Sequence, residues 1–183
     1  MPQKKLIILL DCGDTIIDEG TEVRDARGIV ISANVVPGAD RMVKDLVDSG
    51  FRVALVADGR YASFENVLTQ NGLFDAFETL TCSEAVRYPK PSSRMFKAAL
   101  GSLDLGEADA WRCVMVGNNL ARDIAGAKRM GITTIHLAWT GRYPKEPAST
   151  AEIADYTIKT PTELLPLVHQ LDEQLLARAP QPA

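Results

Sequence analysis

The segment Leu6-Ile7-Ile8-Leu9-Leu10-Asp11-Cys12-Gly13-Asp14-Thr15 joins a run of apolar residues to a polar turn. Short apolar runs that end in a turn are typical of strands buried on both faces of a parallel sheet. Further runs of this kind lie at 53–56, 113–116 and 134–137, with weaker candidates at 79–82 and 156–158. We therefore expect a buried sheet that contains the first run as one of its strands.

Amphipathic patterns lie between the apolar runs. Apolar residues at helical spacing predict helices at 39–48, 63–70, 93–100, 121–130 and 162–176. A strand–helix alternation of this kind predicts an α/β fold, with a three-layer, Rossmann-like parallel sheet and helices on both faces.

Composition limits the classes of protein to consider. The chain has 183 residues, about the size of one domain, and its 20 basic and 24 acidic residues give a net charge of −4. Such a chain has no general field to attract nucleic acid or anionic lipid. No apolar run is long enough to cross a bilayer, and the first residues do not resemble a signal peptide. Three cysteines without metal-ligand spacing predict a reduced, cytoplasmic protein.

Polar residues follow the predicted strands. Asp11 follows the first run, Ala57-Asp58-Gly59-Arg60 follows the second, and Gly117-Asn118-Asn119 follows a later one. Asp123 begins the next helix, and Lys90 precedes another. Ligands of parallel α/β sheets bind beyond the carboxyl ends of the strands, so these residues are expected to gather there. Clustered carboxylates favour Mg²⁺, and a lysine offsets the charge of a phosphoryl group.

Each of these residues also has an ordinary structural interpretation when it is taken alone. Asp and Gly are common in turns, and an acidic residue is favoured at a helix start, which could account for Asp123. A lone lysine is usually solvated, and Cys12 alone is more often a packed side chain than a reactive thiol. The order of the residues along the chain therefore carries the argument for a shared site.

That order resembles the haloacid dehalogenase-like (HAD) hydrolase superfamily, whose motifs begin with Asp-x-Asp-x-Thr after the first strand. The segment from Lys90-Pro91 to Phe96 is similar to the third motif and its helix. The segment from Gly117-Asn118 through Asp123 to Gly131 is similar to the fourth. The resemblance covers the chain from about Lys5 to Leu171.

The resemblance implies a chemistry for each matched position. Asp11 would be the nucleophile that forms an aspartyl-phosphate, and Lys90 would orient it and stabilise the transferring phosphoryl group. Mg²⁺ would be held by Asp11, the Gly13 carbonyl and the Asn118/Asp123 pair. The segment Ala57-Asp58-Gly59-Arg60 and Lys90 would bind phosphate. The implied activity is a Mg²⁺-dependent phosphatase of the phosphoric monoester class.

Three positions depart from the family pattern. Gly13 replaces the general acid/base Asp, a loss that typically costs about 10²–10⁴-fold in rate. Asp14 is an alternative acid, although that alignment misplaces the motif Thr. Ala57 replaces the residue whose hydroxyl contacts phosphate in the second motif. Arg60 could supply a replacement contact, although a lone arginine is more often solvated. Asn118 replaces a metal-binding acid, which predicts weaker Mg²⁺ binding.

The spacing of the motifs leaves no room for a separate cap domain. We expect one HAD-like core domain over residues 1–176, a flap hairpin within 16–36 and a loose tail at 177–183. In the family, members without a cap act on bulky substrates or close the site with a neighbouring subunit. The expected partner is thus a phosphorylated substrate, either small or bulky. A homo-oligomer is possible, and we expect no binding to nucleic acid or membranes.

Two other interpretations compete with the phosphatase. Because three motif positions differ, the chain could be a catalytically silent HAD-like domain that binds a phosphate-bearing ligand or a protein. A phosphoacceptor receiver domain also carries Asp residues after its first strand and a Lys-Pro pair. Its acceptor Asp follows the third strand and its Lys-Pro follows the fifth, whereas Lys90 precedes the run at 113–116.

Overall fold

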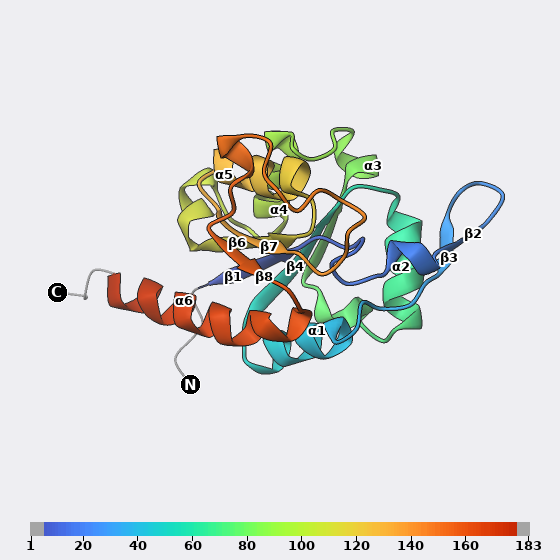
Figure 1. Ribbon diagram of the computed structural model, residues 1–183, viewed down its shortest axis with the longest axis horizontal. Helices are drawn as coiled ribbons and strands as arrows, with labels where there is room; N and C mark the ends of the chain where they lie inside the picture. The colour runs from blue at the N-terminus through green and yellow to red at the C-terminus, as the bar shows by residue number, and fades with distance from the viewer. Residues whose placement is uncertain (1–5, 179–183) are drawn as a thin grey trace.

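A six-stranded parallel sheet forms the centre of the computed structural model, which describes residues 6–178 (Figure 1). The strand order is β5-β4-β1-β6-β7-β8, so the first strand lies between β4 and β6. The strands are β1 (Ile7–Leu10), β4 (Arg52–Ala57), β5 (Thr79–Cys82), β6 (Cys113–Gly117), β7 (Thr133–Leu137) and β8 (Tyr156–Ile158). All six correspond to the predicted apolar runs, including the two weaker candidates, and the predicted fold class is confirmed.

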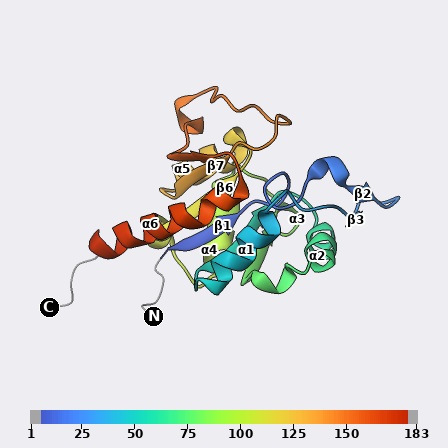
Figure 2. The same cartoon turned by 60° about the horizontal axis from the view of Figure 1, so that its bottom comes forward.

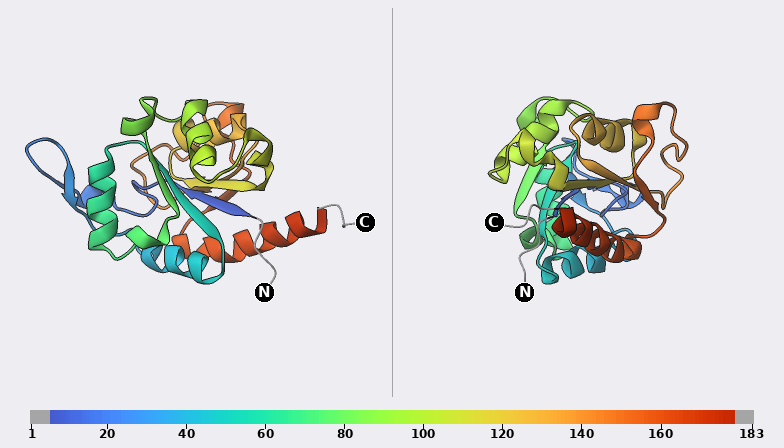
Figure 3. Two further views of the ribbon diagram at one scale, coloured as in Figure 1. Left: turned by 180° about the vertical axis from the view of Figure 1, so that it is seen from behind. Right: turned by 90° about the vertical axis from the view of Figure 1, so that its left-hand side faces the viewer.

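Helices cover both faces of the sheet, because alternate side chains of each strand point to opposite sides. Ile8 and Leu10 of β1 belong to the apolar cluster under α1 and α6, whereas Ile7 and Leu9 belong to the cluster under α4 and α5. Figure 3 shows the sheet between these two layers. The helices are α1 (Ala39–Asp48), α2 (Tyr61–Gln70), α3 (Ser83–Val86), α4 (Ser93–Ser102), α5 (Ala125–Arg129) and α6 (Leu164–Arg178).

The main differences from the predicted helices lie at 121–130 and at the C-terminus. The helix predicted at 121–130 is divided into one π-helical turn at Leu120–Ile124 and the α-helix α5. The Asn119 side chain starts this turn by accepting from the Arg122 N–H at 3.1 Å. At the C-terminus, α6 extends to Arg178, so the predicted tail at 177–183 was wrong for its first two residues. The rest of that tail lies outside the described residues.

A small antiparallel hairpin, β2 (Val23–Arg24) and β3 (Val30–Ser32), lies within the predicted flap segment. It packs against α2, where the Val30 N–H donates to Ser63 Oγ at 3.0 Å and Asn66 Nδ2 donates to the Val30 carbonyl at 2.9 Å. Figure 2 shows the hairpin projecting beside α2. No helix within residues 6–178 is both long and apolar enough to cross a membrane.

Candidate active site

Four predicted residues meet beyond the carboxyl ends of the central strands. Asp11 follows β1, Asp58 follows β4, Asp123 lies on the turn after β6, and Lys90 lies between α3 and α4. The Lys90 ammonium donates to Asp11 Oδ1 and Asp123 Oδ1 at 2.6 Å each, and to the Val56 carbonyl at 2.8 Å. Lys90 also donates its backbone N–H to Asp58 Oδ1 at 2.9 Å. Lys90 thus holds three carboxylates in place.

Burial and charge set the protonation states of this cluster. Lys90 is only 3% exposed, and burial alone would lower its pKa. The Asp11, Asp123 and Asp58 carboxylates instead raise that pKa above its ordinary value, so the ammonium stays charged. Burial, together with the charge of Asp11, raises the pKa of Asp123, and burial also raises the pKa of Asp58. Lys90 supplies one positive charge to three carboxyl groups, so ionising all three leaves an excess of negative charge.

The position of Asp123 depends on a glycine at the end of β6. A Cβ added to Gly117 would lie 2.7 Å from the Asp123 Cβ and would overlap its carboxylate. Asp123 Oδ2 also accepts the Asn119 N–H at 3.0 Å. Both carboxylate oxygens of Asp123 are thus engaged, one by Lys90 and one by the backbone.

The predicted metal donors are only partly assembled. Between residues 6 and 178, no three Asp, Glu, His or Cys side chains converge as a ready metal site. Within the described residues, Asp11 Oδ2 accepts only a long hydrogen bond from Thr15 Oγ1, at 3.5 Å. Asn118 is buried, and its Nδ2 has no hydrogen bond to the described part of the chain. A cation here would depend on the Gly13 carbonyl and the Asn118 amide as well as on carboxylates.

The place of the absent side chain at Gly13 is taken by Glu19, a residue that the sequence analysis missed. A Cβ built on Gly13 would overlap Glu19 Oε1 and lie 2.9 Å from its Cδ. Glu19 begins the 3-10 turn Glu19–Thr21, and its Oε2 accepts the Tyr143 hydroxyl at 3.0 Å. Burial raises the pKa of Glu19, although the hydrogen bond from Tyr143 opposes this shift.

Asp14, the alternative acid, is turned away from the cluster around Lys90. Its side chain is fully buried and its Oδ2 pairs with Arg142 Nε at 2.6 Å. Its Oδ1 accepts the Glu19 N–H at 3.2 Å. Asp14 has a φ of +50°, a left-handed conformation that Asp tolerates better than most residues. Its contacts tie the turn after Asp11 to the loop between β7 and β8.

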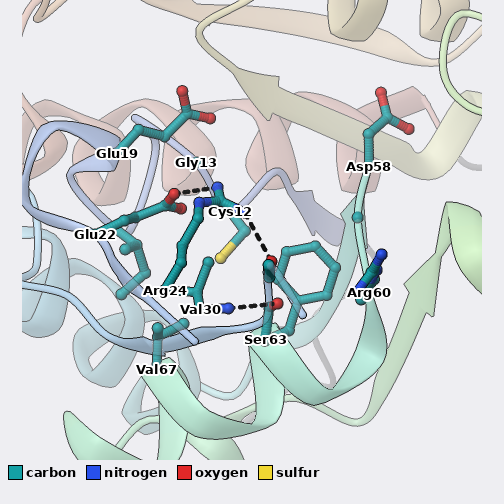
Figure 4. Close-up of a pocket in the computed structure, with 14 residues that line it drawn as sticks. Cys12, Gly13, Glu19, Glu22, Arg24, Val30, Asp58, Arg60, Ser63 and Val67 are labelled. Atoms are coloured by element: carbon teal, nitrogen blue, oxygen red, sulfur yellow. Dashed lines mark hydrogen bonds and ion pairs between the residues drawn. The ribbon is translucent and has the colours of Figure 1, made fainter. Parts of the chain in front are cut away.

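Two adjoining cavities open at this edge of the sheet. The smaller measures about 40 Å³ and is lined by Asp11, Gly13, Glu19, Ala57, Asp58, Lys90, Asn119, Arg122, Asp123 and Tyr143. The larger, about 330 Å³, lies between the flap hairpin and α2 (Figure 4). Gly13, Glu19 and Asp58 line both cavities. In Figure 4 the carboxylates of Glu19 and Asp58 lie at the end opposite Ser63 and Val67.

The predicted phosphate-binding segment is divided between these cavities. Ala57 lines the smaller cavity, Asp58 lines both, and Gly59 and Arg60 line only the larger. The Gly59 N–H donates to Ser83 Oγ at 2.9 Å, so it is already paired. Arg60 Nη1 donates to the Arg27 carbonyl on the flap. Asp58 Oδ2 instead lies 3.8 Å from Arg122 Nη1, which places an unpredicted cation beside the smaller cavity.

The residues missed by sequence analysis share one property: none of them is a defining residue of a family motif. Tyr143 and Arg142 lie on a long loop whose approach to Asp14 and Glu19 depends on the tertiary fold. Arg122 lies within the fourth-motif segment, but only the π-helical turn shows that it faces Asp58. Gly13 could have pointed to Glu19, because a position without a side chain leaves space that a side chain from another segment can fill.

The fold and this cluster define an α/β protein with a buried Asp–Lys–Asp site at the carboxyl ends of its strands. A model of the haloacid dehalogenase-like hydrolase family matches residues 6–131, which is more than half of the sequence. The chain therefore belongs to the haloacid dehalogenase-like hydrolase family.

Named relatives include two archaeal phosphatases. The chain is 31% identical over 139 residues to the glyceraldehyde 3-phosphate phosphatase of Pyrococcus furiosus, a match that covers 76% of this chain and 55% of the relative. It is also 31% identical over 139 residues to the ribulose-1,5-bisphosphate 5-phosphatase of Halopiger xanaduensis, covering 74% and 57%. The chain thus spans about half the length of the curated relatives it matches.

Solved structures share the fold at lower sequence identity. The crystal structure of an HAD phosphatase from Thermococcus onnurineus superposes with a TM-score of 0.72 at 20% identity, covering 89% of this chain and 97% of that one. The L-2-haloacid dehalogenase of Xanthobacter autotrophicus superposes with a TM-score of 0.64 at 19% identity, covering 75% and 62%. The three-layer α/β core is common to both.

Proposed function

We propose that this protein is a Mg²⁺-dependent phosphatase that acts on small phosphorylated molecules through an aspartyl-phosphate on Asp11. The observation that carries the proposal is the Lys90 ammonium, which lies 2.6 Å from both Asp11 and Asp123 beside a cavity of about 40 Å³. The named phosphatases among the relatives support the same activity.

Asp11 would attack phosphorus through its oxygen not bound by Lys90. Its Oδ1 is fixed by Lys90, which leaves Oδ2 to form the new bond as the ester oxygen departs. Lys90 keeps its charge and would offset the repulsion between the carboxylate and the phosphoryl oxygens. Asp123 positions Lys90 from the opposite side. Arg122, at the cavity wall, is available to contact a phosphoryl oxygen.

The donors at this edge fit a hard divalent cation. Four carboxylates line the smaller cavity, against two cations, Lys90 and Arg122. We propose that Asp11, the Gly13 carbonyl and Asn118 hold Mg²⁺. Asp123 would contribute indirectly, because it fixes the position of Lys90. When bound, the ion would offset the negative charge of Asp11 and of the phosphoryl group. Asn118 adds no charge to this set, so we expect weaker binding than a carboxylate would give.

The larger cavity would hold the leaving group. Its volume of about 330 Å³ is within the range that suits small organic ligands. Its lining combines charged residues, among them Arg60 and the Arg24–Glu22 ion pair, with the apolar Phe64 and Val67. We therefore propose a small phosphorylated organic substrate in a reduced, cytoplasmic compartment, consistent with the three free and buried cysteines. We also propose that the chain forms one HAD-like core domain, as predicted for residues 1–176, with its last helix α6 continuing to Arg178.

A phosphatase assay of the purified protein tests this proposal. We expect release of inorganic phosphate from triose and pentose phosphates with Mg²⁺, and loss of that activity with EDTA. Asp11→Asn is expected to abolish turnover, because the amide keeps the shape but is not a nucleophile. Asp48→Asn, at the exposed end of α1, is the matched control and is expected to retain full activity. Equal turnover in Asp11→Asn and the parent would refute the proposed mechanism.

A further inference from the structure

The carboxylate of Glu19 occupies the space that a side chain at position 13 would enter. A Cβ on Gly13 would overlap Glu19 Oε1 and approach its Cδ to 2.9 Å and its Cγ to 3.0 Å. Gly13 is the position at which the family resemblance implies a general acid/base carboxyl. The cavity that Asp11 lines thus does contain a carboxylate at position 13, but this carboxylate comes from the flap segment and not from the motif.

Two hydrogen bonds hold Glu19 in this place, and an ion pair fixes one of its partners. Tyr143 donates its hydroxyl to Glu19 Oε2 at 3.0 Å, and the Glu19 N–H donates to Asp14 Oδ1 at 3.2 Å. Asp14 is fixed in turn by Arg142, at 2.6 Å. Among residues 6–178, the hydrogen bonds of the Glu19 carboxylate involve only Oε2. Oε1, the atom nearest to Gly13, is therefore available for another partner.

Glu19 also lies where the two cavities meet. It lines the smaller cavity with Asp11 and Lys90, and it lines the larger cavity under the flap. In the proposed reaction the phosphoryl group lies in the first and the leaving group in the second, so the breaking P–O bond lies between them. Asp58 lines both cavities too, but its Oδ1 accepts the Lys90 N–H and its Oδ2 faces Arg122.

We propose that Glu19 is the general acid and base of this phosphatase, in place of the carboxyl absent at Gly13. The inference rests on the proposed function. As Asp11 Oδ2 bonds to phosphorus and the ester P–O bond breaks, the Glu19 carboxylic acid gives its proton to the leaving oxygen, which departs as an alcohol. Glu19 then takes a proton from water, whose oxygen bonds to phosphorus as the P–O bond to Asp11 breaks. Phosphate leaves, and both residues return to their starting states.

The test compares substrates that differ in their need for a proton. For a two-step phosphatase, kcat/KM reports on formation of the aspartyl-phosphate, whereas kcat also includes its hydrolysis. Glu19→Gln keeps the size of the side chain but cannot transfer a proton. We expect kcat/KM for an alkyl phosphate such as glycerol 2-phosphate to fall about 10²–10⁴-fold. For p-nitrophenyl phosphate, whose leaving group needs no proton, we expect a loss smaller than about tenfold.

A second readout separates proton transfer from a structural role. During turnover of p-nitrophenyl phosphate, Glu19→Gln is expected to accumulate phosphorylated protein, because the water lacks its base. Glu65→Gln, an exposed change on α2, is the matched control and is expected to keep the parent's substrate ratio. A misfolded Glu19→Gln would lose activity towards both substrates equally and would unfold at a lower temperature. Glu19→Asn is then the second variant, and the same selective loss is required of it.

Moving the carboxyl back to position 13 gives the decisive variant. Gly13→Asp alone is expected to damage the site, because its Cβ overlaps Glu19. Gly13→Asp combined with Glu19→Ala removes the overlap and is expected to restore the alkyl phosphate activity lost in Glu19→Ala. An equal loss of both substrates in stable Glu19 variants, or no loss, would overturn the inference. If the parent cleaves no phosphate ester, the proposed function itself fails, which is a different result.

Discussion

Replacing Lys90 with methionine tests the charge balance of the site through stability alone. Methionine has a similar length but no charge, so Lys90→Met removes hydrogen bonds of 2.6 Å to Asp11 and Asp123 and one of 2.8 Å to Val56. Removing one partner of a buried ion pair typically costs about 3–5 kcal/mol, because the other charge stays buried. Against a usual folding stability of about 5–15 kcal/mol, this is a large share.

The loss should also depend on pH in a defined direction. Burial and the charge of Asp11 already raise the pKa of Asp123, and Lys90 opposes that rise. Without Lys90 the folded-state pKa of Asp123 goes up further, so the folded variant binds a proton that the unfolded chain has released. Stability then falls as the pH rises from the unfolded pKa towards the folded one. We therefore expect a larger deficit at pH 8 than at pH 5.

Urea unfolding followed by circular dichroism, with EDTA present, measures both effects. Lys97→Met is the matched control, because the ammonium of Lys97 pairs with Glu107 at 2.8 Å while both side chains remain about half exposed. Such a surface pair contributes about 0–1 kcal/mol. The reasoning about Lys90 is refuted if Lys90→Met costs no more than Lys97→Met, or if its deficit is the same at both pH values.

Three further predictions concern Gly117, Asn118 and two buried cysteines. Gly117→Ala is expected to cost about 1–3 kcal/mol in an unfolding titration and to lower activity, because its Cβ overlaps the Asp123 carboxylate; wild-type values would contradict this. Asn118→Asp is expected to lower the Mg²⁺ concentration at half-maximal activity by adding a charged ligand, and an unchanged value would count against Asn118. Burial raises the pKa of Cys12 well above its ordinary value and that of Cys113 to about 12, so iodoacetamide at pH 8 should label both only after unfolding.

The strand-end rule explains why much of the site could be predicted from sequence. Asp11 and Asp123 are far apart in sequence, but β1 and β6 are parallel neighbours whose carboxyl ends meet at one edge. A polar residue directly after β1, or on the turn that follows β6, is therefore expected at this edge. Lys90 follows no strand directly, so its inclusion rested on its place before a predicted helix and on the resemblance to a family motif. The burial of its ammonium between two carboxylates then follows from the fold.

The acid/base group could not be predicted in the same way. Glu19 reaches Gly13 because a 3-10 turn and the Tyr143 hydroxyl direct its side chain, and Tyr143 is 124 positions away in the sequence. Asp14 was the candidate visible from sequence, but its pair with Arg142, another distant residue, removes it from the reacting atoms. Contacts between residues so far apart leave no local sequence pattern, so only the three-dimensional arrangement shows which carboxylate lines the cavity with Asp11.

The account depends most directly on a covalent bond between Asp11 and phosphorus. Acid quenching during turnover of p-nitrophenyl phosphate, followed by peptide mass spectrometry, would locate the phosphoryl group. Because Glu19→Gln is expected to slow hydrolysis of the intermediate, it should be measured alongside the parent. We predict one phosphoryl group on the peptide that contains Asp11, and none in Asp11→Asn. A phosphoryl group on another residue, or turnover by Asp11→Asn, would contradict the account.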